Sequence, residues 1–181
     1  MDFDNLEYLR TGSRRQQDAY SVLIKNKILF RLKEYEPILV GTIPINIDIE
    51  SSDLDIICYF SNMQGFIEAI NNNFRTETNF KIIELQSKET SIIVSNFFID
   101  NFEIEIFGQN IPTKHQFAYR HLLVEQNLLN NHDEKFRQHI IELKRKGYKT
   151  EPAFAIALGL IGDPYLELLK FEEHSKTTID S

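Results

Sequence analysis

The 181-residue sequence contains a single cysteine, Cys58. One thiol cannot form an intrachain disulfide, so a reducing compartment is the expected environment. None of the five histidines stands at a ligand spacing from Cys58, and a structural zinc site is therefore not expected. Cys58 also follows Asp55 by three residues, an odd spacing that puts the two side chains on opposite faces of a strand. We therefore expect no nucleophilic role for this thiol.

Long apolar runs are also absent. No uninterrupted apolar stretch reaches the roughly eighteen residues of a membrane span, and the first residues do not combine a charged segment with a following apolar one. These absences predict neither secretion nor membrane insertion, and we expect a cytoplasmic protein that makes no contact with a membrane.

Basic residues are outnumbered, with 20 Lys and Arg against 27 Asp and Glu, which gives a formal net charge of -7. This charge repels polyanions and argues against non-specific nucleic-acid binding. Hydrophobic residues make up 42% of the chain and include 14 Phe, so the sequence can bury a core and is not typical of a disordered tail or a coiled coil. The length suits one compact domain, and the oligomeric state is left open.

Apolar periodicity predicts mixed secondary structure in the first part of the chain. A helix is expected from Ser13 to about Glu36, with a Ser13–Gln16 capping box and a stop at Pro37. A second helix should start at Asn62 and end near Phe74. The short β-branched and aromatic runs predict strands at 38–40, 53–60, 80–85, 91–99 and 102–107, the last two forming a hairpin.

After Pro112 the pattern becomes helical, with expected helices at 114–130 and 133–146, a third starting at Thr150 and a fourth capped by Asp163. We therefore predict an α+β fold in which a mixed sheet is flanked by helices. Residues 1–112 would form the α/β core, and residues 113–181 a helical region packed on it as one compact unit.

Asp53 and Asp55 lie two residues apart on a predicted strand, so both carboxylates project from one face. Two like charges so placed need a cation, and Mg²⁺ is commonly held by one or two carboxylates plus substrate phosphates. The pair therefore suits a metal–nucleotide complex. A solvated strand end is the alternative reading of the same two residues.

The glycine before this pair extends the pattern. Val40-Gly41-Thr42 is followed, after ten intervening residues, by Asp53-Leu54-Asp55-Ile56, and FEIEIFG comes later in the chain. This arrangement resembles the nucleotidyltransferase superfamily, which has the polymerase β-like fold. The resemblance implies an NTP substrate and Mg²⁺ or Mn²⁺ ions held by Asp53, Asp55 and a third carboxylate on a neighbouring strand. Glu105 would be that carboxylate, with Glu103 as the alternative, while Gly41 and Thr42 would contact the triphosphate.

A closer resemblance covers nearly the whole chain. The segments GTIPI, SDLDIIC, EIFGQ and KTEPAFAIALGLIGDPY look like an uncharacterised bacterial family, a domain of unknown function assigned to the same superfamily. No established reaction comes with that family, so the resemblance implies a fold rather than a substrate.

Several features depart from the superfamily pattern. Thr42 stands where Gly or Ser is usual, and IPINIDI follows where a short helix is usual. No Arg or Lys occurs from Gly41 to Asp55. Arg14 and Arg15 could contact phosphate or be solvated surface charges. His121 could face the groove or serve only for packing, and the basic run 144–146 is interpreted as a helix terminus.

Two functions follow from these residues. The first is an enzyme that moves a nucleoside monophosphate from an NTP to an unidentified acceptor hydroxyl, with Asp53, Asp55 and Glu105 as metal ligands. The second is a non-catalytic nucleotidyltransferase-like module that binds a ligand or partner. The presence of all three expected carboxylates favours the first function, and the absence of a basic residue near Gly41 favours the second.

Overall fold

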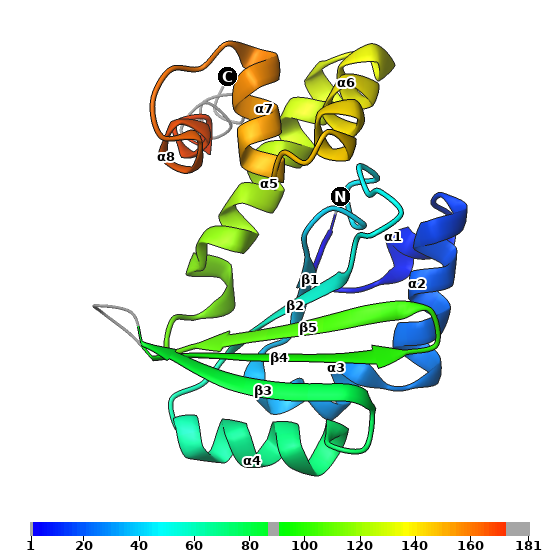
Figure 1. The fold of residues 1–181 in the computed structure, drawn as a ribbon, viewed down its shortest axis with the longest axis vertical. Helices are drawn as coiled ribbons and strands as arrows, with labels where there is room; N and C mark the ends of the chain where they lie inside the picture. Colours follow the sequence, from blue (N-terminus) through cyan, green and yellow to red (C-terminus); the bar gives the residue numbers. More distant parts are fainter. Residues whose placement is uncertain (1, 87–90, 173–181) are drawn as a thin grey trace.

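A computed structural model describes residues 2–86 and 91–172 of the chain. Its centre is a five-stranded mixed sheet in the order β1-β2-β5-β4-β3 (Figure 1). In this sheet β2 and β5 run parallel, and the other neighbouring strands run antiparallel. The strands are β1 (Ile38–Val40), β2 (Leu54–Tyr59), β3 (Thr78–Gln86), β4 (Ser91–Ile99) and β5 (Phe102–Gln109). The predicted α+β class and the β4–β5 hairpin are confirmed.

The helix predicted from Ser13 to about Glu36 is wrong in its extent. It begins with the expected capping box, but it divides at Lys27, whose backbone is left-handed with φ +52°. This break turns the chain so that both Ile28 and Leu32 reach the core, where each is fully buried. The resulting elements are α2 (Arg14–Lys25), α3 (Ile28–Arg31) and the 3-10 turn η1 (Lys33–Tyr35).

Two further helices belong to this half of the chain. The short α1 (Glu7–Arg10) was not predicted from the sequence. The helix α4 (Met63–Phe74) was, and the Asn62 side chain caps it by accepting a hydrogen bond from the backbone of Gly65. In Figure 1, α4 lies below the sheet, on the opposite side from the C-terminal helices.

The second half of the described chain is helical, as predicted. Asp133 and Asp163 cap two of its helices by accepting hydrogen bonds from backbone N–H groups. Figure 1 shows the C-terminal α-helices gathered on the side of the sheet opposite α4. They are α5 (Phe117–Asn131), α6 (Glu134–Arg145), α7 (Thr150–Leu158) and α8 (Pro164–Leu169), preceded by the 3-10 turn η2 (Thr113–His115). The predicted boundary at residue 112 falls between β5 and η2 and stays a prediction, and residues 173–181 lie outside the described part.

Two hydrophobic cores lie on opposite faces of the sheet. Because strand side chains alternate, β2 sends Ile56 and Cys58 into the core under α2–α4. It sends Ile57, on the same face as Asp55, into the core under the C-terminal helices. Cys58 is fully buried, which raises the pKa of its thiol. The carboxylate of Asp55 therefore lies on the face that the C-terminal helices cover.

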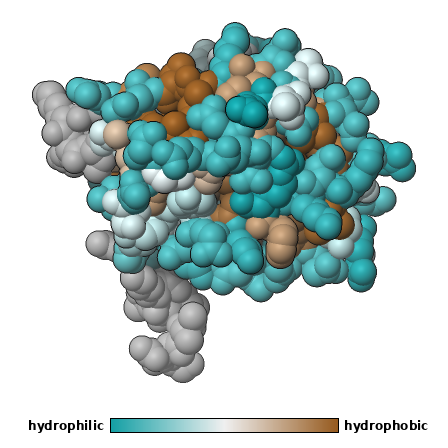
Figure 2. Space-filling view, turned by 90° about the horizontal axis from the view of Figure 1, so that it is seen from below, coloured by the Kyte–Doolittle hydropathy of each residue, from teal (hydrophilic) through white to brown (hydrophobic). Residues whose placement is uncertain are grey.

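The outer surface of the molecule is mixed in polarity. Figure 2, which views the structure from the end where α4 lies, shows a mainly hydrophilic surface with a few separate apolar patches. Across residues 2–86 and 91–172, no helix is both long and apolar enough to cross a membrane.

Candidate active site

The parallel pair β2 and β5 brings two predicted metal ligands together. Asp55 and Glu105 are direct partners in the register of these strands, and Asp53 stands immediately before β2. On the other side of β5, Asn96 of β4 pairs with Glu105 and donates a hydrogen bond of 3.1 Å to its Oε2 atom. The strand adjacency expected from the sequence is therefore present, with three carboxylates at neighbouring positions of the sheet.

Gly41 directly follows β1 and lies against the Asp55 carboxylate. Its backbone is left-handed, with φ +78°, and its neighbour Val40 pairs with Asp55 across the antiparallel β1–β2 ladder. A Cβ atom at position 41 would lie 2.0 Å from the Asp55 Oδ2 atom, which no real contact allows. Glycine is thus required here both by backbone conformation and by the position of the carboxylate.

The segment between Gly41 and Asp53 contains no helix, and its alternating isoleucines explain why. Ile43 packs into the core under α2–α4, whereas Ile45 and Ile47 pack into the core under the C-terminal helices. All three side chains are essentially fully buried. The unusual IPINIDI sequence therefore anchors this loop between the two faces of the fold. At its ends, the Thr42 hydroxyl donates a hydrogen bond of 3.2 Å to Ser52 Oγ.

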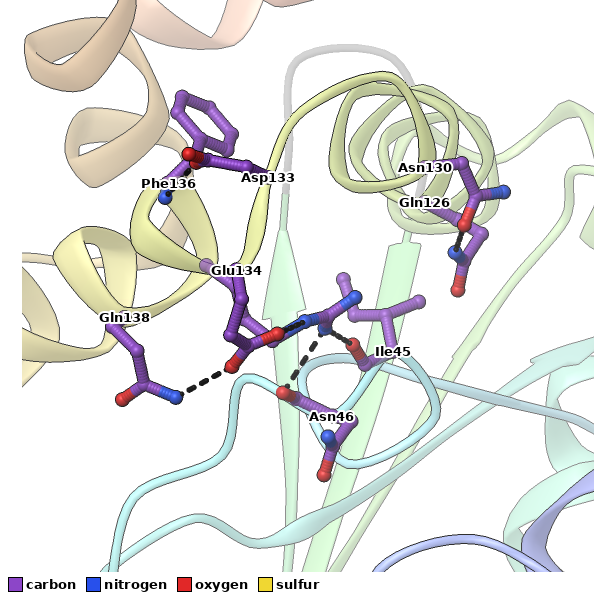
Figure 3. A network of polar contacts seen from close by, with 9 residues as sticks. Ile45, Asn46, Gln126, Asn130, Asp133, Glu134, Phe136 and Gln138 are labelled. Atoms are coloured by element: carbon purple, nitrogen blue, oxygen red, sulfur yellow. Dashed lines mark hydrogen bonds and ion pairs between the residues drawn. The ribbon is translucent and has the colours of Figure 1, made fainter.

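Helix α6 holds the same loop from the opposite side with three basic side chains. Arg137 Nη1 donates hydrogen bonds to the carbonyl oxygens of Ile45 and Asn46, at 2.6 and 3.2 Å. Figure 3 shows these two loop residues beside Glu134 of α6. About two turns further on, Lys144 Nζ donates to the carbonyl of Ile47 at 2.9 Å, and Arg145 pairs with Glu50 at 2.9 Å. The C-terminal helices thus fix the backbone that leads into Asp53.

A cavity of about 1210 Å³ lies between the sheet and these helices. Gly41, Thr42, Asp53, Asp55 and Glu105 line its sheet side. The helical side contributes further ionisable side chains, among them His121, for which the groove was one of two predicted positions. Three others were not placed there from the sequence: Glu125 from α5, Lys144 from α6 and Glu151 from α7.

Burial and neighbouring charges shift the pKa values of Asp55 and Lys144 at the cavity. Burial raises the pKa of Asp55 to about 8, the negative charges of Asp53 and Glu105 add to the rise, and Lys144 partly offsets it. Burial lowers the pKa of Lys144 to about 8, while Asp48 and Glu125 act in the opposite direction. Lys144 therefore compensates only part of the negative charge of the carboxylates, and this side of the cavity is suited to receive a cation.

The chemistry of these donors fits a divalent ion such as Mg²⁺ or Mn²⁺. Asp53, Asp55 and Glu105 offer only oxygen ligands, and the raised pKa of Asp55 reflects a carboxylate whose charge is not compensated by the protein. Within residues 2–86 and 91–172, no three His, Cys, Asp or Glu side chains already converge on one point. Glu105 instead accepts from Asn96, so its side chain would have to turn toward Asp55 to share an ion.

A family model described as a domain of unknown function, DUF4269, matches residues 21–171. The chain belongs to this family. No curated protein matches the chain in sequence. The DUF4269 match agrees with the second resemblance found in the sequence.

Solved structures of nucleotide-polymerising enzymes share this fold. The chain is similar to the Cid1 poly(U) polymerase with MgGTP bound, at 15% identity over 74% of this chain and with a TM-score of 0.54. It is also similar to a chain of the GLD-2/RNP-8 complex, at 14% identity over 84% of this chain and with a TM-score of 0.52. A cytoplasmic RNA terminal U-transferase is similar at 12% identity over 77% of this chain, with a TM-score of 0.51. This DUF4269 chain spans 42%, 60% and 45% of those three chains, respectively. At these identities the likeness shows the fold alone.

The remaining candidate residues lie away from the cavity or serve its walls. Arg14 is largely exposed and pairs with Asp18. Arg15 donates to the carbonyl of Ser52 at 3.0 Å and lies over the Phe102 ring, so it supports the residue before Asp53. Neither arginine lines the cavity, and a phosphate contact by either stays an unsupported prediction.

The choice between the two glutamates of β5 follows from the register. Glu105 is the direct partner of Asp55 and lines the cavity, whereas Glu103 pairs with Phe98 of β4 and does not line it. Glu105 also contributes to the pKa shift of Asp55. The geometry therefore favours Glu105 as the third carboxylate.

His121 was expected either to face the groove or to serve only for packing. It is buried and also lines the cavity. Its Nε2 atom lies 2.9 Å from the carbonyl oxygen of Tyr165, which can only accept, so Nε2 carries the proton and donates. Its Nδ1 atom lies 3.6 Å from Glu151 Oε1. This histidine therefore joins α5 to α7 and α8 at the cavity wall.

The prediction that residues 144–146 form a helix terminus is confirmed, since Lys144 and Arg145 lie in the last turn of α6 and Lys146 is its C-cap. A further role of Lys144 was not predicted. Its side chain is buried and reaches the cavity, while Lys146 is exposed at the end of the helix. The signal was present in the sequence, because Lys144 follows Ile140 by four residues and so continues the apolar stripe of α6. Glu125 likewise follows His121 by four residues on the buried face of α5.

Proposed function

We propose that this protein is a metal-dependent nucleotidyltransferase, which moves a nucleoside monophosphate from an NTP to an acceptor hydroxyl. The observation that carries the proposal is the direct pairing of Asp55 with Glu105, beside Gly41 and on the wall of a large cavity. The fold shared with nucleotide-transferring enzymes agrees with it.

In this proposal the chain's own residues position the reactants. Asp53, Asp55 and Glu105 would hold two divalent ions, which when bound stabilise negative charge on the transferring phosphoryl group and on the acceptor oxygen. The backbone at Gly41 and the Thr42 hydroxyl would lie along the triphosphate. Lys144 would supply the positive charge that the loop itself lacks, because it reaches the cavity from α6.

The reaction would join the acceptor oxygen to the α-phosphorus and break the bond from that phosphorus to the bridging oxygen. Pyrophosphate leaves with the electron pair of that bond. Glu105 lies at the end of the carboxylate row next to β4 and would accept the proton of the acceptor hydroxyl. In this arrangement the buried charges of the site would stabilise the transition state more than the bound substrates.

The test compares two positions of the label in the NTP. With Mg²⁺ and fractionated cell extract as the source of acceptor, label in the α-phosphate should be transferred and label in the γ-phosphate should not. Removing a metal ligand commonly costs about 4 kcal/mol of transition-state stabilisation, so Asp55→Asn should lower the rate about a thousandfold. Asp18→Asn, at a partly exposed position of α2 that does not line the cavity, is the matched control and should transfer label normally.

The non-catalytic alternative makes a different prediction in the same assay. Nucleotide that binds the native protein tightly but is never transferred to any fraction would support a regulatory module. A folded protein that binds no nucleotide would leave partner binding as the leading function. The main ground for this alternative is the absence of a basic residue near Gly41 in the sequence, and Lys144, which lines the same cavity as Gly41, weakens that ground.

A further inference from the structure

The helical wall of the cavity carries polar atoms that the nucleotide site does not use. Glu125 on α5 is 4% exposed, and its Oε1 atom has no hydrogen-bond partner within the described protein. Gln116, at the start of the same helix, is 1% exposed, and its Oε1 atom is also without a partner there. Both residues line the cavity.

The orientation of the Gln116 amide is fixed by its other half. Its Nε2 atom donates to the carbonyl oxygens of Cys58 and Ile111, at 2.9 and 2.8 Å. Carbonyl oxygens only accept, so the nitrogen and oxygen cannot be exchanged, and the free atom is an acceptor. The unpartnered atom of Gln116 is therefore an acceptor, and so is that of Glu125 when its carboxyl group is ionised. Burial, together with the negative charge of Glu151, raises the pKa of Glu125 well above its ordinary value, so the ionised form lacks stabilisation until a donor or a cation reaches it.

The excess of acidic residues around the cavity also favours a ligand that donates hydrogen bonds. Six carboxylate residues line it, namely Asp53, Asp55, Glu105, Glu125, Glu151 and Asp163, against two lysines, Lys144 and Lys149. Bound metal ions would compensate the first three, and Asp163 is engaged as a helix cap. Glu125 on α5 and Glu151 on α7 remain as cavity-lining carboxyl groups that could accept from a positive group, with Glu151 also 3.6 Å from His121 Nδ1.

The cavity also has room for more than one reactant. Its volume of about 1210 Å³ exceeds the range of about 300–1,000 Å³ typical of a site for one small ligand. Gln116 and Glu125 are nine residues apart along α5, which corresponds to about 14 Å at 1.5 Å per residue. A molecule that satisfies both would be extended and would carry hydrogen-bond donors along its length.

From these features we propose that the acceptor hydroxyl belongs to an amine-bearing polyol, whose ammonium group binds at Glu125 and Glu151 and whose other donors reach Gln116. This inference rests on the proposed function for the role of the bound molecule as acceptor. It differs from an RNA acceptor, which would bring a polyanion against the carboxylates of this wall and a chain of net charge -7.

The test uses a matched pair of probes that differ only in charge. A short oligosaccharide of glucosamine carries ammonium groups, and its N-acetylated counterpart replaces them with neutral amides. Calorimetric titration of the protein with Mn²⁺ and a non-hydrolysable NTP analogue should show that the aminated probe binds at least about tenfold more tightly, the size expected for one hydrogen bond to a charged group. An RNA oligonucleotide of similar length should not bind.

Variants locate the effect in the cavity. Glu125→Gln keeps the shape of the side chain and should remove most of the preference for the aminated probe, with nucleotide binding unchanged. Glu142→Gln, at an exposed position of α6, should keep the preference. Equal binding of both probes, binding of neither, or tighter binding of the RNA would overturn the inference.

The outcome is separable from that of the proposed function. If the nucleotide analogue binds and the aminated probe does not, the acceptor inference alone fails. If the aminated probe binds with the Glu125 dependence but the protein never binds the nucleotide analogue, the cation site stands and the proposed transferase function fails.

Discussion

Lys144 Nζ donates a hydrogen bond of 2.9 Å to the carbonyl oxygen of Ile47, a residue 97 positions earlier in the chain. This contact ties α6 to the loop between Gly41 and Asp53. The same ammonium group faces the site carboxylates, and its positive charge moderates the pKa rise of Asp55. One side chain therefore links the helical region, the loop and the candidate metal site.

Replacing this side chain should destabilise the protein. Lys144→Met leaves the Ile47 carbonyl without its charged donor and the nearby carboxylates without a counter-charge, so we expect a loss of about 1–3 kcal/mol in the free energy of unfolding. Lys146→Met, two residues later and exposed, should change it by less than about 0.5 kcal/mol. Urea denaturation of the two variants measures both values, and equal stabilities would contradict a bracing role for Lys144.

Alanine substitutions at two glycines, Gly41 and Gly147, separate the cost of backbone strain from the cost of a Cβ atom that clashes with Asp55. Gly41→Ala combines a strained left-handed backbone with a Cβ placed 2.0 Å from Asp55 Oδ2. Gly147→Ala carries only the strain, since φ is +95° there and nothing lies within 4 Å of the added Cβ. The strain costs about 1–2 kcal/mol in each variant, and overpacking should add about 1–3 kcal/mol at position 41 alone.

These glycine variants also differ in their expected effect on ligands. The alanine at position 41 displaces the Asp55 carboxylate, so it should weaken binding of a manganese–nucleotide complex, whereas Gly147→Ala should leave that binding intact. Calorimetry on both proteins checks this, together with thermal denaturation for stability. Unimpaired metal–nucleotide binding by Gly41→Ala would separate Gly41 from the site.

The raised pKa of Asp55 predicts a pH dependence of stability in the metal-free protein. The folded protein holds the Asp55 proton with a pKa of about 8, well above the ordinary value of 3.8, so the folded state binds this proton more tightly than the unfolded state. Stability due to this group is therefore present below about pH 4 and is lost as the pH rises to about 8, at up to about 1.4 kcal/mol per pH unit.

Comparison with a neutral variant isolates that contribution. Urea denaturation in the presence of a chelator at pH 5, 6, 7 and 8 should show the native protein losing stability relative to Asp55→Asn, whose amide does not titrate. Mg²⁺ should reduce this loss in the native protein alone. A constant difference between the two proteins across this range would show that Asp55 is not the buried, uncompensated carboxylate described above.

The sequence predicted the parts of the fold that local physics controls. The Ser13–Gln16 capping box, the Asp163 cap and the hairpin of residues 91–99 and 102–107 were all found where the pattern placed them. The break at Lys27 was not predicted, because the apolar spacing continues across it and only tertiary packing of Ile28 and Leu32 forces the turn. Periodicity reports which residues are buried more reliably than where a helix bends.

The site residues on the sheet could be predicted from the sequence, whereas Lys144 and Glu125 on the helices could not. Asp53, Asp55 and Glu105 share strand alternation and a recognisable spacing after Gly41. Lys144 and Glu125 come from helices far along the chain, and nothing local shows that these two charged residues meet the carboxylates. Their position on apolar helix stripes was the available signal, but only the fold reveals which cavity they face.

The central claim, that Asp53, Asp55 and Glu105 together hold the metal ions of an NTP complex, is tested most directly by diffraction. Crystals of the native protein soaked with Mn²⁺ and a non-hydrolysable NTP analogue should show anomalous peaks of manganese about 2.0–2.3 Å from oxygens of these carboxylates and of the phosphates. The Glu105 side chain should have left Asn96, and the triphosphate should run past Gly41 toward Lys144. Manganese bound elsewhere, or a nucleotide seated in the cavity with no ion between it and Asp55, would contradict the account.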